Sequence, residues 1–125
     1  MRHIILTIMI LLMLSGFAVN ITKENIKRNY SDEEIVKAIF ISEGGAKARY
    51  KFGIRSVSYE NYQDARAICK RTVHNARSRW IKAGKRGDFL EALARQYCPM
   101  AATNDPRGLN KNWKRNVQFY LKRGV

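Results

Sequence analysis

Acidic residues, proline, histidine and cysteine are all scarce in this chain, and each shortage excludes a class of protein. Two histidines and two cysteines are too few for a metal cage built from such ligands. Only 2 of the 125 residues are proline and 8 are glycine, which excludes a collagenous or low-complexity chain. No GxxxxGK[ST] loop occurs, so a P-loop nucleotide enzyme is excluded. What remains is a chain with 46% hydrophobic residues, enough for one folded domain.

The first 18 residues are typical of a secretory signal peptide and not of a folded element. A short basic start is followed by an apolar run over residues 4–14, and then by the small residues Gly16 and Ala18. The run is shorter than the roughly 20 residues that a membrane-spanning helix needs, so an N-terminal anchor is the weaker interpretation. We expect cleavage after Ala18 and a single secreted or periplasmic domain over residues 19–125.

Both cysteines, Cys69 and Cys98, fall in that mature part. In an exported chain an even pair favours one disulfide, here closing a loop of about 30 residues. Two buried thiols are the alternative.

Hydrophobic spacing predicts a mainly α fold of about four helices with one short β-hairpin. Ser31 and Glu34 form a capping-box pattern for a first helix that ends before Gly44. A second helix is expected from Asn61 or Tyr62 to Gly84, a third from Asp88 to Pro99 and a fourth from about Asn110. The β-prone segment over residues 50–59 predicts the hairpin.

Glu43 is the residue whose position favours catalysis most. It ends the apolar first helix, where a negative charge opposes the helix dipole and partial burial raises the pKa of a carboxyl group. Gly44 and Gly45 follow without side chains, so a substrate can approach closely. An exposed glutamate at a helix end is the plain alternative.

Two segments resemble the lysozyme-like superfamily, in particular its small secreted lytic transglycosylases and goose-type lysozymes. Residues 41–54 (ISEGGAKARYKFGI) resemble the active-site segment, in which a catalytic glutamate ends a helix and a Phe-Gly-Ile strand follows. Residues 108–121 (GLNKNWKRNVQFYL) resemble the closing helix, and the Tyr-Cys-Pro string at 97–99 fits the same group. The resemblance covers residues 31–121 and implies an α+β lysozyme-like fold.

The resemblance also implies an activity: cleavage of the β-1,4 bond between N-acetylmuramic acid and N-acetylglucosamine in peptidoglycan, with Glu43 as general acid/base and no cofactor or metal. Lys51 stands where hen-type enzymes carry a second acid. A single acid resembles a lytic transglycosylase, in which the substrate's own groups complete the reaction and an anhydro-sugar forms. A hydrolysing muramidase would instead need a second carboxylate from Glu60, Asp64 or Asp105, of which the first two lie where they cap a helix.

Further residues are candidates for substrate binding. Tyr50 and Tyr97 are candidates for stacking on sugar rings, and Asn112 and Asn116 for bonding acetamido groups. Three more come from the active-site segment and its continuation: Gly53, Ile54 and Ser56. Arg55 and Ser56 stand where a glutamine commonly follows the strand in the goose-type pattern.

The basic balance requires an anionic partner or surface. Lysine and arginine number 24 against 10 acids, a formal net charge of +14. For an exported protein, anionic wall polymers and membrane headgroups are the near candidates, while the export signal argues against nucleic acid. The rival hypothesis is a non-catalytic cationic protein that binds peptidoglycan or membranes, as antimicrobial proteins do. A solvated basic face that aids solubility is the alternative explanation of the charge.

Overall fold

The structure is a computed structural model that describes residues 29–99, 102–103, 105 and 107–125. Within these residues the fold is mainly helical and has no β-strand. The α-helices are α2 (Asp32–Ser42), α3 (Tyr62–Lys82), α4 (Phe89–Tyr97) and α5 (Trp113–Lys122). Short 3-10 turns are η1 (Gly45–Lys47), η2 (Lys51–Gly53) and η3 (Leu109–Asn112). The predicted signal peptide, residues 1–18, lies outside the described residues.

The helix boundaries follow the capping residues that the sequence predicts. Ser31 caps α2 in a full capping box: its Oγ accepts from the Glu34 backbone N–H at 3.2 Å, and its own N–H donates to the Glu34 carboxylate at 2.8 Å. Asn61 and Asp88 cap α3 and α4 by simple N-caps, in which their side chains accept from the backbone N–H groups of Asp64 and Leu90. The mainly α prediction is therefore confirmed. None of the described helices is long and apolar enough to cross a membrane.

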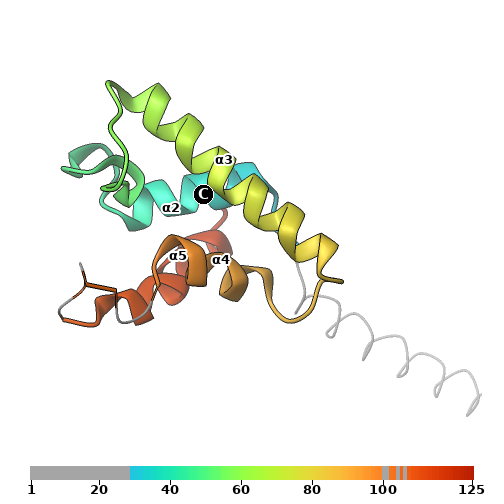
Figure 1. The fold of residues 1–125 in the computed structure, drawn as a ribbon. Helices are drawn as coiled ribbons and strands as arrows, with labels where there is room; N and C mark the ends of the chain where they lie inside the picture. The colour runs from blue at the N-terminus through green and yellow to red at the C-terminus, as the bar shows by residue number, and fades with distance from the viewer. Residues whose placement is uncertain (1–28, 100–101, 104, 106) are drawn as a thin grey trace, which may run out of the picture.

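One hydrophobic core joins all of these elements. The longest helix, α3, runs along one side of the molecule and packs against α2 and α4, and α5 packs against both of these beneath it (Figure 1). The buried stripe of α3 consists of Ala65, Cys69, Val73 and Ala76. Both α3 and α5 pack against α2. This packing fixes the position of the last residues of α2.

The predicted hairpin over residues 50–59 is wrong. The segment instead forms the turn η2, because Phe52 (φ 56°) and Gly53 (φ 70°) are consecutive left-handed residues, which no strand accommodates. The Phe52 ring is buried against Phe40, with centroids 5.1 Å apart. The Lys51 backbone N–H donates to the Tyr59 hydroxyl at 2.7 Å instead of to a partner strand. Core packing of one aromatic ring thus overrides the local β preference.

Ion pairs join the start of α2 to the basic face of α3. Glu33 pairs with Arg66 and Lys70, and Asp32 pairs with Arg77, whose Nε lies 2.5 Å from Oδ1. Lys70 and Arg66 lower the pKa of Glu33. Part of the basic face is therefore neutralised within the molecule, and fewer of the chain's cations face an external partner than the sequence alone indicates.

Candidate active site

Glu43 is the C-cap residue of α2, at the point where the chain turns out of the helix. Its backbone N–H still donates to the Ile39 carbonyl at 3.0 Å, and the left-handed Gly44 (φ 104°) then ends the helix. The carboxyl group is thus carried by the end of a well-packed helix. Rigid placement of this kind is what proton transfer to a bound substrate requires.

The Glu43 carboxyl packs directly on the backbone of Gly53. A β-carbon at position 53 would lie 2.7 Å from Oε2 and 2.8 Å from Cδ of Glu43, far inside van der Waals contact. Gly53 also has a φ of +70°, which side chains disfavour. Glycine is therefore required here twice, once by the backbone and once by the carboxyl group that it contacts.

Burial raises the pKa of the Glu43 carboxyl above that of an exposed glutamate. Two neighbours oppose the shift: Trp113, as a nearby donor, and the positive charge of Arg55. The Trp113 indole N–H is buried and has no hydrogen bond of ordinary geometry within the described part of the chain. Its effect on Glu43 therefore comes from proximity and not from a well-formed bond. The net result is a carboxyl group that keeps its proton to higher pH than usual.

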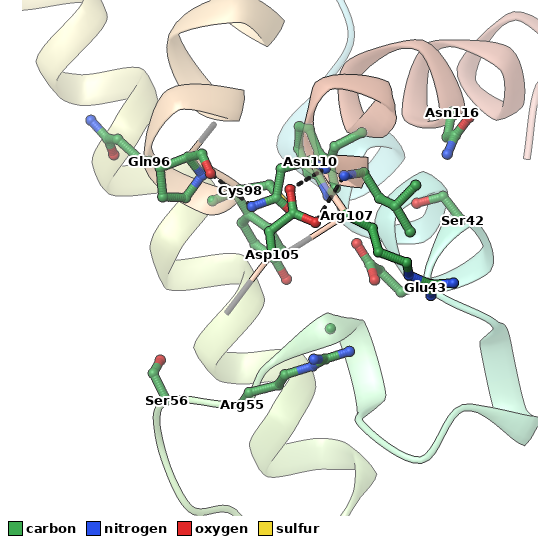
Figure 2. A pocket seen from close by; sticks show the side chains of 15 residues that line it. Ser42, Glu43, Arg55, Ser56, Gln96, Cys98, Asp105, Arg107, Asn110 and Asn116 are labelled. Atoms are coloured by element: carbon green, nitrogen blue, oxygen red, sulfur yellow. Dashed lines mark hydrogen bonds between the residues drawn. The ribbon is translucent and has the colours of Figure 1, made fainter. Parts of the chain in front are cut away.

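The carboxyl faces an open cleft of about 760 Å³. Its walls come from the end of α2, the η2 turn and the residues after it, the end of α4, the segment leading into η3, and α5 (Figure 2). A volume of this size accommodates an extended polar ligand such as part of a sugar chain.

The cleft contains some of the predicted binding residues and not others. Gly53, Ser56 and Tyr97 line it together with Glu43. Ile54 does not, because its side chain is buried in the core. Tyr50 and Asn112 also lie outside the lining. The Tyr50 ring contacts the guanidinium groups of Arg49 and Arg55, and the Asn112 side chain accepts from Arg115 at 3.3 Å. Asn116, which was also predicted, does line the cleft.

Tyr97 supports the η2 turn, on which the Glu43 carboxyl packs. Its hydroxyl donates to the Phe52 carbonyl at 2.5 Å. The Cys69 sulfur lies 3.5 Å from the Tyr97 hydroxyl oxygen. The Tyr97 ring stacks on Trp113, with centroids 5.1 Å apart. Burial raises the pKa of this hydroxyl far beyond its usual range. Tyr97 therefore holds the η2 turn, and with it Gly53, against Glu43.

Asp105 is the second carboxylate of the cleft, but backbone groups occupy both of its oxygens. They accept from the Leu109 and Asn110 N–H groups, each at 2.8 Å. The other two acids considered, Glu60 and Asp64, are not in the lining; the Asp64 carboxylate accepts from the Glu60 N–H at 3.3 Å at the start of α3. In the described part of the cleft, Glu43 is thus the acid without a competing structural role.

The expected disulfide is not present, and this prediction is corrected: Cys69 and Cys98 are both free thiols. Cys69 is buried beside the Tyr97 hydroxyl, whereas the Cys98 thiol donates to the Asn110 amide oxygen at 2.9 Å. Each sulfur has its own polar neighbour, and burial raises the pKa of both thiols to about 11. The structure corresponds to the alternative of two thiols.

Sequence reasoning missed several polar residues of the cleft, mostly those outside the active-site segment. They are Ser42, Gln96, Arg107 and Asn110. The only indication of these residues in the sequence is the polar composition of the segment after α4, which is typical of a surface loop and not of a core element. Within the described residues, no three His, Cys, Asp or Glu side chains gather as metal ligands would.

Comparison of the chain with protein-family models, with curated proteins and with solved structures finds no match. The geometry of the site and the resemblance of residues 41–54 and 108–121 are therefore the observations that bear on function.

Proposed function

We propose that this protein cleaves peptidoglycan glycan strands at the β-1,4 bond between N-acetylmuramic acid and N-acetylglucosamine, with Glu43 as general acid/base. One observation carries the proposal: a partly buried carboxyl group at the end of α2 packs on Gly53 and faces an open, polar cleft. The resemblance of residues 41–54 to the lysozyme-like active-site segment supports the choice of substrate.

The reaction needs a proton at the glycosidic oxygen, because an alkoxide is a poor leaving group. Burial keeps the Glu43 carboxyl protonated to higher pH, so it is suited to donate that proton as the C–O bond breaks. Glu43 is then a carboxylate beside an oxocarbenium-like sugar.

The cleft favours transglycosylation over hydrolysis as the second step. Asp105 has both oxygens engaged by backbone N–H groups, so it is poorly placed to act as a nucleophile or to activate water. In the anhydro-forming route, the sugar's own C6 hydroxyl attacks C1 and the Glu43 carboxylate takes up its proton. This step restores the acid without any second carboxylate.

Mass spectrometry of purified peptidoglycan after incubation with the protein tests the proposal, with Glu43→Gln as the matched variant. We expect anhydro-muramyl products from the wild type and at least a hundredfold slower release from Glu43→Gln, the range for loss of a general acid. Reducing-end muramyl products would mean hydrolysis. Equal product release by the two proteins would refute the role of Glu43.

A second candidate function is non-catalytic binding of anionic wall polymers or membrane headgroups. The observation in its favour is the C-terminal end of α3 and the turn after it, where Lys82, Lys85 and Arg86 are exposed and make no ion pair with the described residues. Such binding would survive Glu43→Gln and weaken steeply with added salt, because the charges are exposed to screening ions.

A further inference from the structure

Two arginines in the cleft have hydrogen-bond donors that no acid of the described chain takes up. Arg55 follows the η2 turn and Arg107 precedes η3, and both line the same cavity as Glu43. Figure 2 shows their side chains entering this space from opposite walls. By contrast, the cations of α3 next to α2 are paired with Asp32 and Glu33.

Arg55 is held in a defined place. Its guanidinium lies 5.1 Å from the centroid of the Tyr50 ring, a cation–π contact, and the preceding residue, Ile54, is anchored in the core. The guanidinium is also near enough to Glu43 for its charge to act on the carboxyl group. An anion bound by Arg55 would therefore lie beside the scissile bond.

Asp105, which lines the same cleft, does not pair with the Arg55 guanidinium. Both Asp105 oxygens accept from backbone N–H groups, and no ion pair joins Asp105 to Arg55 or to Arg107. A guanidinium presents a planar fork of donors that matches a carboxylate in bidentate geometry. The charge and shape of this wall thus fit an anionic group better than a neutral sugar.

We propose that Arg55 binds a carboxylate carried by the muramoyl sugar next to the scissile bond, and so makes the enzyme selective for anionic over neutral glycan strands. The inference rests on the proposed function, which supplies the sugar. The carboxylate has two sources: the lactyl group itself, free in strands without peptide, or the acidic residues of a stem peptide. Neutral strands of N-acetylglucosamine alone carry neither.

Titration calorimetry tests this selectivity directly, in the Glu43→Gln variant so that the ligand is not cleaved during the measurement. Three ligands are compared: a GlcNAc-MurNAc tetrasaccharide with free lactyl carboxylates, the same tetrasaccharide with these groups as methyl amides, and its stem-peptide derivative. Arg55→Gln is added to this background, with Arg49→Gln as the control. Arg49 contacts the same Tyr50 ring at 5.4 Å and loses the same charge, but it does not line the cleft.

If the lactyl group is the ligand, the free tetrasaccharide binds about tenfold tighter than its amide, as for a hydrogen bond to a charged group, and Arg55→Gln removes the difference. If the peptide is the source, only the peptide derivative shows this advantage and this dependence on Arg55. Arg49→Gln keeps the preference in either case. Equal affinities for all three ligands, equal losses in the two variants, or no binding would overturn the inference.

The failure of the proposed function has a different signature. Wild-type protein that binds carboxylate strands through Arg55 and releases no product in the mass spectrometric assay would refute catalysis and leave the recognition intact. Wild-type protein that cleaves amidated, free and peptide-bearing strands at equal rates would refute the selectivity and leave catalysis intact.

Discussion

At the scale of single residues, Gly53 determines where the Glu43 carboxyl can lie. We predict that Gly53→Ala lowers both the free energy of unfolding, by about 1–3 kcal/mol for a strained left-handed backbone, and the rate of glycan cleavage. The added β-carbon would displace the carboxyl group that now lies 2.7 Å from its position. Urea unfolding and product release measure the two effects.

Gly87→Ala is the matched control for this substitution. Gly87 has nearly the same φ, +71°, but nothing lies within 4 Å of a β-carbon placed there. It should show the backbone cost and keep its activity. Equal activity in the Gly53 and Gly87 variants would show that contact with Gly53 does not position Glu43.

Arg55 also sets the pH dependence expected of Glu43. The active form is the protonated acid, so kcat/KM falls as pH rises through the pKa of the free enzyme's carboxyl. Burial raises that pKa, whereas Trp113 and the positive charge of Arg55 lower it. We predict that Arg55→Gln moves the alkaline limb of the kcat/KM profile to higher pH. Arg107 and Asp105 face the same cleft and are unchanged in this variant.

The same profile for Arg49→Gln separates a local effect from a change in net charge. Arg49 is not among the charges that act on Glu43. Its limb should coincide with that of the wild type. A limb that stays in place in Arg55→Gln, or that moves equally in both variants, would argue against Glu43 as the titrating acid.

At the scale of elements, the η2 turn is held by side chains and not by strand pairing. We predict that Tyr97→Phe lowers the free energy of unfolding by about 1–3 kcal/mol, because the Phe52 carbonyl loses the donor that the hydroxyl provides. Its KM for glycan strands should change little if Tyr97 supports the turn without binding sugar. Tyr62→Phe keeps the ring that contacts Phe52, with centroids 5.6 Å apart, and should unfold like the wild type. A raised KM with unchanged stability would reverse this assignment.

The helices were predictable because their signals are local, and the η2 turn was not. Ser31, Asn61 and Asp88 each precede an apolar periodicity and each caps a helix. By contrast, Phe52 adopts its left-handed conformation because its ring is buried among residues distant in sequence. Glu43 and Gly53 were proposed as site residues from the sequence alone. Most of the rest of the cleft's lining comes from residues 96–99, 105, 107, 109, 110, 113 and 116, which only the tertiary fold brings to Glu43.

At the scale of the whole molecule, the net charge of +14 is distributed unevenly. The acids at the start of α2 neutralise one stretch of α3, whereas Lys82, Lys85 and Arg86 at its other end have no ion pair with the described residues. This end of α3 does not line the cleft. The basic end and the candidate active-site cleft are therefore separate features, and their contributions can be measured separately.

We predict that replacing Lys82, Lys85 and Arg86 together by glutamine weakens binding to intact cell-wall material and reduces the dependence of that binding on salt. Attraction between exposed charges and an anionic polymer falls as salt screens it, so fewer cations give a shallower decline. Sedimentation with sacculi at increasing salt measures this. Cleavage of short soluble strands should be unchanged, because the cleft keeps Glu43 and Arg55. An equal loss on soluble strands would place these cations in the substrate path instead of on a separate wall-binding surface.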